Sequence, residues 1–273
     1  MPNHPLTIIN SHWFDKTREI KNIPQPCNIM VDDIISYSNT LPNIFIQVEP
    51  NIIINNEHYL LNNFTLFHTI FTYNENLLHR CPNAKFCVVG TTWIDKNFEI
   101  IDISKKQFKI STLVGAKIIN NSIGHILRHL IHHAQTHILK DCPITYFRSS
   151  HQLPHIKDYG GNPLLGTSKM PLFEEFKFAI VIENTRECNC FSEKIMDCIL
   201  TKTIPIYWGC SNIDKFFDIS GWIILETGTV EELSSKITKL SDDYYDNYKH
   251  IIDKNFTEAL KYVDMYDNIN NAI

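Results

Sequence analysis

Short apolar runs that alternate with helical patterns constrain the fold of this chain most strongly. In the first part, runs typical of buried strands occur at 6–10, 44–48, 68–73 and 85–89. In the second part, they occur at 108–114, 143–147, 178–182 and 204–208. Helical patterns lie at 122–138, from Ser192 onward, at 229–240 and at 243–263. Because strands joined through helices pair in parallel, the pattern predicts an α/β fold with mainly parallel sheets.

A change of character near residue 105 predicts two α/β halves. The segment 95–106, DKNFEIIDISKK, has the composition of a connector, and different motifs follow it. We therefore expect an N-terminal domain over 1–105 and a C-terminal domain over 106–240. The segment 241–273 is expected to be helical and could pack back on the N-terminal domain. Ligands of open α/β sheets bind at the carboxyl ends of strands, so the site is expected there.

Composition and charge are those of a globular protein. Hydrophobic residues make up 44% of the chain and charged residues 20%, unlike a disordered segment. The net charge of -5 argues against a nucleic-acid binder, because such proteins carry a basic surplus. Without a visible signal peptide or long apolar stretch, we expect a soluble, cytoplasmic protein with no transmembrane segment and with reduced cysteines. The sequence does not predict an oligomeric state.

The strand–loop–helix segment that begins with the apolar run FAIVI is the strongest candidate site. The run brings Glu183 and Asn184 to the carboxyl end of a strand, and Ser192 is placed to cap the next helix. Backbone N–H groups at a helix start bind anions, and Lys194 would neutralise an anion there. The alternative is a solvated ion pair among Glu183, Glu193 and Lys194, since such units occur in many folds.

Spaced motifs around this segment carry a specific resemblance. They are Phe176-Lys177-Phe178, Glu183-Asn184, Ser192-Glu193-Lys194 and Ile204-Pro205-Ile206-Tyr207-Trp208-Gly209. Residues 176–213 thereby resemble the signature region of the α1,3/4-fucosyltransferases, glycosyltransferase family 10. The resemblance is clear over 106–225 and weaker over 44–94. It implies a GT-B fold with two Rossmann-like domains facing across a cleft, GDP-fucose as donor and inversion at the anomeric carbon.

The resemblance also implies which residues bind the donor. In that family a basic residue on the first helix of the donor domain grips the diphosphate, and Arg128 matches it here. Its planar guanidinium can bind phosphate oxygens bidentately, although a surface arginine beside histidines is the alternative. Lys194 would share the diphosphate. Donor ribose or sugar contacts are assigned to Glu183, Asn184 and Glu193, and Ser192 is counted with the donor-binding residues. By this resemblance the domain over 106–240 binds the donor and the domain over 1–105 binds the acceptor.

Two further features allow an ordinary structural explanation beside a functional one. The segment Tyr159-Gly160-Gly161-Asn162 resembles a glycine-rich donor loop of bacterial family members, and a plain turn explains it equally well. The other feature is a group of histidines that share part of one helical face, namely His125, His129, His132 and His133. We expect a partly exposed histidine-rich face rather than a zinc site, and no essential metal.

A carboxylate in the N-terminal domain is the implied catalytic base. An inverting transferase needs a group that removes the proton of the attacking hydroxyl. Glu49 follows the run IFIQV and is the first candidate, and Glu75 is the reserve. An ordinary loop carboxylate is the alternative for Glu49. Cys190 departs from the family pattern, which often has tyrosine there, so strict fucose specificity is left open.

These observations together predict an inverting glycosyltransferase. It would transfer L-fucose from GDP-fucose to a hydroxyl of a glycan acceptor, in an α1,3-type linkage by resemblance, with no tightly bound cofactor. The alternatives are the same fold with another GDP-sugar, or a nucleotide-binding relative without catalysis. A Rossmann dehydrogenase is disfavoured because no G-x-G-x-x-G follows a predicted strand.

Overall fold

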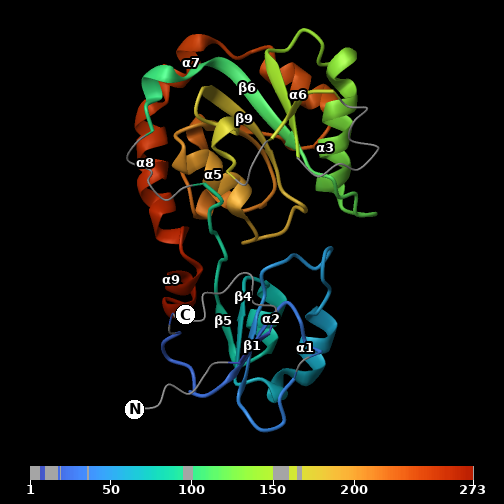
Figure 1. The fold of residues 1–273 in the computed structure, drawn as a ribbon, viewed down its shortest axis with the longest axis vertical. Coiled ribbons are helices and arrows are strands. Elements are labelled where there is room, and N and C mark those ends of the chain that lie inside the picture. The colour runs from blue at the N-terminus through green and yellow to red at the C-terminus, as the bar shows by residue number, and fades with distance from the viewer. Residues whose placement is uncertain are drawn as a thin grey trace. The chain divides into compact units, whose positions relative to one another are not determined.

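The computed structural model describes residues 7–9, 18, 20–35, 37–94, 101–149, 160–164 and 168–272. These residues form two compact units, drawn as ribbons in Figure 1. Unit 1 takes the described residues within Met1–Val89, Glu187–Cys190 and Asp264–Ile273. Unit 2 takes those within Gly90–Arg186 and Phe191–Val263.

Unit 1 is built on a five-stranded parallel sheet with the order β1-β2-β3-β4-β5. Its strands are β1 (Thr7–Ile9), β2 (Asn28–Val31), β3 (Asn43–Ile46), β4 (Thr69–Thr72) and β5 (Ala84–Phe86). Its helices are α1 (Glu57–Asn63), α2 (Glu75–Arg80) and α9 (Met265–Asn270).

The strands β2, β3 and β4 of unit 1 are buried on both faces. On one face, Ile29 and Ile44 pack in a cluster with Met265 of α9. On the other face, Phe45 packs with Leu60 of α1 and Leu77 of α2. Because successive side chains of a strand point to opposite faces, a strand covered on both sides is apolar throughout. This explains why the sequence shows continuous apolar runs here and no apolar–polar alternation.

Unit 2 holds a six-stranded parallel sheet with the order β11-β10-β9-β6-β7-β8. Its strands are β6 (Gln107–Val114), β7 (Ile144–Arg148), β8 (Asn162–Pro163), β9 (Phe176–Ile182), β10 (Ile204–Trp208) and β11 (Ile223–Ile224). Its helices are α3 (Ile123–His133), α5 (Glu193–Leu200), α6 (Val230–Ile237), α7 (Asp242–Asn247) and α8 (Lys249–Ala259).

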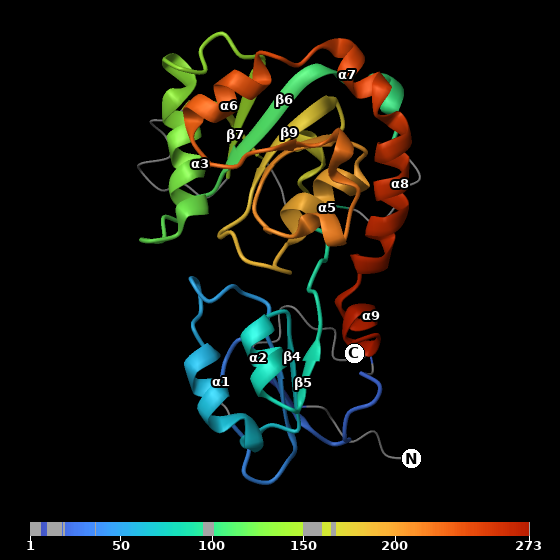
Figure 2. The same cartoon turned by 180° about the vertical axis from the view of Figure 1, so that it is seen from behind.

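Helices cover both faces of this sheet. Phe178 and Ile180 of β9 pack in one cluster with Leu127 of α3 and Leu233 of α6. Both views show α3 and α6 side by side, and α5 beside α8 (Figures 1 and 2). Since β6, β9 and β10 are neighbours and parallel, their carboxyl ends reach the same edge of the sheet. The loops and helix starts that follow these strands therefore meet at this edge.

The fold confirms the predicted α/β class and differs from the sequence-based elements in detail. The helix expected over 243–263 is split, because α7 ends at Asn247 and α8 starts at Lys249. The strands β2, β8 and β11 were not predicted. β2 lies just after a proline-rich segment that reads as loop, and β11 has only two residues. In the described part of the chain, none of the helices has both the length and the apolar character that a bilayer span requires.

Candidate functional site

The carboxyl end of β9 and the first turn of α3 are in direct contact. Gly124 N donates to Asn184 O at 3.3 Å, and Ser122 Oγ donates to the same oxygen at 2.8 Å. A Cβ atom at Gly124 would lie 1.7 Å from Glu183 O, closer than two atoms can approach. Only glycine therefore allows the helix start to reach the strand end.

Arg128 lies one turn further along α3 and points back to the same strand end. Its Nη1 donates to Ile182 O at 2.6 Å and its Nη2 to Asn184 Oδ1 at 2.9 Å. Both acceptors are neutral, and they use two of the five N–H donors of a guanidinium. Burial lowers the pKa of Arg128, and the nearby carboxylates of Glu183 and Glu193 oppose this shift. The guanidinium is thus held in a fixed orientation, and these two bonds leave its other N–H donors for further acceptors.

The start of α5 is built as the sequence predicts. Ser192 is the N-cap, and its Oγ accepts from Lys194 N at 3.3 Å. Glu183 is 5% exposed, and its two carboxylate oxygens accept from Ser192 N at 3.0 Å and from Ser192 Oγ at 2.6 Å. Glu183 therefore ties the end of β9 to the cap of α5. The predicted cap is confirmed.

Glu193 binds two lysines at once. Its Oε1 lies 3.0 Å from Lys169 Nζ and 3.3 Å from Lys194 Nζ. Burial alone would raise the pKa of Glu193, but the two ammonium groups outweigh burial and hold its pKa below the usual range. For Lys194, burial lowers the pKa, and the carboxylates of Glu193 and Glu183 more than compensate and raise it. Glu193 and Lys194 are therefore both charged at neutral pH.

Asp197, one turn after Lys194 on α5, is fully buried. Its Oδ1 accepts from Thr92 Oγ1 at 2.6 Å and from Trp93 N at 2.9 Å. Its Oδ2 makes no hydrogen bond within the described residues and lies 4.0 Å from Lys169 Nζ. Burial raises the pKa of Asp197 to about 6, against the opposing effects of Lys169 and the two hydrogen bonds.

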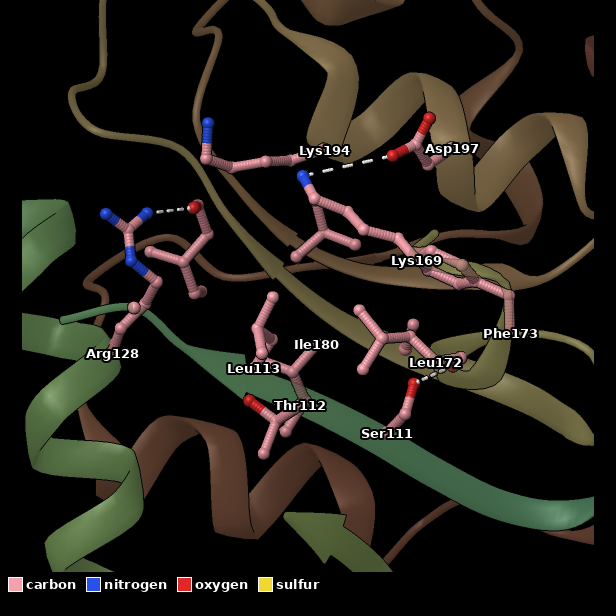
Figure 3. Close-up of a pocket in the computed structure, with 14 residues that line it drawn as sticks. Ser111, Thr112, Leu113, Arg128, Lys169, Leu172, Phe173, Ile180, Lys194 and Asp197 are labelled. Atoms are coloured by element: carbon pink, nitrogen blue, oxygen red, sulfur yellow. Dashed lines mark hydrogen bonds and ion pairs between the residues drawn. The ribbon is translucent and has the colours of Figure 1, made fainter. Parts of the chain in front are cut away.

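Arg128 and Lys194 line the same cavity in unit 2, which has a volume of about 160 Å³. Figure 3 shows their charged ends at one end of it, and Ser111, Leu172 and Phe173 at the other. The cavity is also lined by Leu113, Ala179 and Val181 of the sheet and by Lys169 and Asp197. It joins a cationic end to an apolar body. Such a shape suits a ligand with a phosphate group and a less polar remainder.

The remaining predicted donor residues fall into two groups, one beside the cationic end of the cavity and one away from its lining. Glu183, Asn184, Ser192 and Glu193 adjoin the cationic end through the bonds given above. Gly160 and Gly161 have φ of +66° and +78°, and a Cβ at Gly161 would lie 2.7 Å from Tyr146 O. This turn leads the chain into β8, and neither glycine is among the residues lining the cavity. Tyr159 lies outside the described residues.

The histidines on α3 serve the local structure in different ways. His125 Nδ1 lies 2.9 Å and His129 Nε2 3.3 Å from Lys117 O, so both rings hold the loop between β6 and α3. His132 packs edge-to-face on Tyr146 with ring centroids 5.1 Å apart. Among the residues that the structure describes, no three His, Cys, Asp or Glu side chains are grouped so as to hold a metal ion.

The candidate bases lie in unit 1. Glu49 N donates to Asp32 Oδ2 at 3.0 Å, and Tyr73 Oη donates to Glu49 O at 3.3 Å. Glu75 is the first residue of α2, and its Oε1 accepts from Asn189 Nδ2 at 3.2 Å. Asp32 also accepts from Val48 N at 2.8 Å, so it fixes the backbone leading to Glu49.

Three polar residues around these sites were missed by sequence reasoning. Lys169 was signalled only by its place at the end of the long loop 148–170. Asp197 was signalled by one acidic residue inside the apolar run IMDCIL, and Asp32 by an acidic pair after NIMV. Such single acidic or basic residues are common on protein surfaces, so none of these signals identifies a buried site by itself.

Sequence comparison finds one informative relative. No family model matches the chain. The α-(1,3)-fucosyltransferase FucT of Helicobacter pylori is 34% identical over 56 residues, which are 20% of this chain and 12% of the relative. The match thus spans about an eighth of that protein's length. It confirms the predicted resemblance to the α1,3-fucosyltransferases, which are glycosyltransferases.

Two solved structures with similar folds have low sequence identity. The α,α-trehalose-phosphate synthase (UDP-forming) of Burkholderia vietnamiensis aligns with a TM-score of 0.53 at 6% identity, over 83% of this chain and 67% of that one. TarM aligns with a TM-score of 0.51 at 13% identity, over 89% and 55%. With the two parallel sheets described above, these likenesses confirm the predicted GT-B fold.

Proposed function

We propose that this chain, which resembles the α1,3-fucosyltransferases in sequence and has a GT-B fold, is an inverting glycosyltransferase. In this proposal it transfers L-fucose from GDP-fucose to a hydroxyl group of a glycan acceptor. The unit 2 cavity binds the donor, and no metal is required to hold it.

One observation carries the proposal: Arg128 and Lys194, 66 positions apart in the numbering of the chain, line a single cavity. Two cations at one end of the cavity favour an anion with several oxygens, such as a diphosphate. Arg128 offers a planar pair of donors, and Lys194 offers a point charge at a helix start. The same two residues are those that the resemblance assigns to the diphosphate.

The proposed reaction forms one bond, breaks one bond and transfers one proton. The acceptor oxygen attacks the anomeric carbon of fucose while the bond from that carbon to the phosphate oxygen breaks. GDP leaves with the electron pair, and Arg128 and Lys194 stabilise the negative charge that develops on it. Glu49 takes the proton of the attacking hydroxyl, with Glu75 as the reserve candidate.

The residues between the two cations are proposed to shape the donor site. Glu183 bonds to Ser192, and Asn184 bonds to Arg128, so both already orient the charged groups. In the proposal, Asn184 and Ser192 also offer hydrogen bonds to the ribose or the sugar. Glu193 holds Lys194 in place through the 3.3 Å contact.

A thermal-shift screen tests the donor class. A ligand that binds only the folded state raises Tm by mass action, so the correct nucleotide should stand out among GDP, UDP, CMP and their sugars. We expect GDP and GDP-fucose to raise Tm and the others to leave it unchanged. A shift with UDP alone contradicts the proposed donor. A shift with GDP but with no GDP release from any GDP-sugar, with or without acceptors, indicates a nucleotide-binding relative without catalysis.

A further inference from the structure

Lys169 is a third cation that lines the donor cavity, beside Arg128 and Lys194. It comes from the segment just before the short helix Met170–Leu172, far in sequence from both other cations. Its side chain is 13% exposed, and its ammonium group lies 4.4 Å from the centre of the Trp93 ring. Figure 3 shows its Nζ turned toward Asp197.

Lys169 and Lys194 are brought together by the same carboxylate oxygen. Both ammonium groups contact Glu193 Oε1, at 3.0 Å and 3.3 Å. Glu193 thus sets two positive charges side by side at the wall of one cavity. Two like charges repel each other, so this pairing is unfavourable unless anions lie between or beside them. Glu193 supplies one anion, and the cavity offers room for another.

The charge balance of the site also favours an anionic ligand beside these lysines. Arg128, Lys169 and Lys194 contribute three positive charges around the cavity, and Glu183 and Glu193 contribute two negative charges. Asp197 adds a third carboxyl group at the wall. Without Lys169, the three carboxyl groups would outnumber the two remaining cations, which disfavours a diphosphate. Lys169 therefore makes the cavity more favourable for a diphosphate.

We propose that Lys169 binds the diphosphate of the donor together with Lys194, with Glu193 positioning both ammonium groups. The inference rests on the proposed function, because it assigns a residue to the same donor site. A diphosphate has oxygen atoms on two phosphorus atoms, so it can accept from both lysines at once. Lys169 Nζ donates to Glu193 Oε1 at 3.0 Å and lies 4.0 Å from Asp197 Oδ2, which is too far for a second hydrogen bond. Within the described residues, its other ammonium donors can therefore serve the ligand.

Calorimetric titration of GDP and guanosine tests this role. Lys169→Met removes the charge and keeps much of the aliphatic stem, while Lys169→Arg keeps the charge. Lys177→Met is the matched control, because Lys177 is 11% exposed, pairs with Asp242 at 2.6 Å and does not line the cavity. The Tm of each variant shows whether it is folded under the conditions of the titration.

We expect Lys169→Met to weaken GDP binding about tenfold or more, the range of one hydrogen bond between charged groups. Guanosine carries no phosphate, so its affinity should stay within about twofold of wild type. Lys169→Arg should retain most of the GDP affinity, and Lys177→Met should leave it unchanged. A structural role alone would weaken guanosine and GDP equally.

Two results overturn the inference and are distinguishable from failure of the proposed function. Unchanged GDP affinity in Lys169→Met, with weaker binding in Arg128→Ala and Lys194→Ala, removes Lys169 from the site and leaves the donor site intact. Equal losses of GDP and guanosine affinity in Lys169→Met also contradict a phosphate contact. If the wild-type chain binds no GDP, the proposed donor itself fails.

Discussion

At the scale of single residues, the fully buried His132 of α3 links the stability of the fold to pH. His132 is fully buried, and burial lowers its pKa from 6.5 to about 3, assisted by His129 and His133. Between these values the unfolded chain binds a proton that the folded chain does not. The contribution of His132 to the free energy of unfolding is therefore fully present above pH 6.5 and is lost as pH falls toward 3.

His132→Phe should reduce this pH dependence, because phenylalanine has a similar ring and no titrating group. For the wild-type chain, this one histidine should lower the free energy of unfolding by about 1.4 kcal/mol per pH unit below its unfolded pKa. Urea denaturation at several pH values between 7 and 4 measures the slope. The exposed His133→Gln is the control, and an unchanged slope in His132→Phe contradicts the account.

The sequence predicted site residues where a motif fixed their spacing. Ser192, Glu193 and Lys194 form one turn of a helix start, so their mutual arrangement follows from the chain itself. Arg128 came from its match to a family position. Lys169 and Asp197 could not be predicted, because their place at the cavity depends on how separate elements pack, and sequence spacing carries no information on that.

At the scale of elements, the contact between α3 and β9 sets the geometry of the cationic end. Gly124 allows the first turn of α3 to meet the backbone of Glu183 and Asn184. Arg128 starts from that helix and bonds to the same strand end. If the helix moved outward, the guanidinium would leave the cavity that it shares with Lys194.

Gly124→Ala should therefore destabilise unit 2. Its Cβ would lie 1.7 Å from a backbone oxygen that cannot move without disturbing the sheet. We expect a loss of about 3 kcal/mol or more, measured as a lower Tm by scanning calorimetry. Gly115→Ala is the matched control, because a Cβ there meets no atom within 4 Å. Equal Tm values for the two variants would show that α3 does not pack as described.

Elements with strong local patterns were predicted well, and weaker ones were not. β9 and β10 are buried on both faces and appear in the sequence as continuous apolar runs. β11 has two residues and depends on pairing with β10, so no local pattern marks it. The segment 243–263 was predicted as one helix, because the spacing of its apolar residues does not show the break between α7 and α8.

At the scale of the whole molecule, the proposed functions are divided between the two units. The donor cavity is lined by residues of unit 2, and Glu49 and Glu75 belong to unit 1. The segment Glu187–Cys190, between β9 and α5 in sequence, also belongs to unit 1. The assignment of this short segment to unit 1 follows from tertiary packing, and the composition of the sequence does not indicate it.

Glu49→Gln should separate catalysis from donor binding. GDP affinity should stay as in wild type, because Glu49 is not among the residues lining the donor cavity. Release of GDP from GDP-fucose, with water or a glycan as acceptor, should slow by about a hundredfold or more, the usual contribution of a general base. Glu75→Gln is the matched variant. Slower release in Glu75→Gln with normal release in Glu49→Gln would assign the base to Glu75.

The central claim is that Arg128 and Lys194 together hold a diphosphate, and calorimetric titration with GDP tests it most directly. Arg128→Ala and Lys194→Ala should each weaken binding about tenfold or more, because each removes a charged hydrogen bond to phosphate. The control is Lys202→Ala, since Lys202 is 26% exposed against 27% for Lys194 and pairs with Asp253 outside the cavity. GDP affinity that stays at the wild-type value in both cavity variants would contradict the claim.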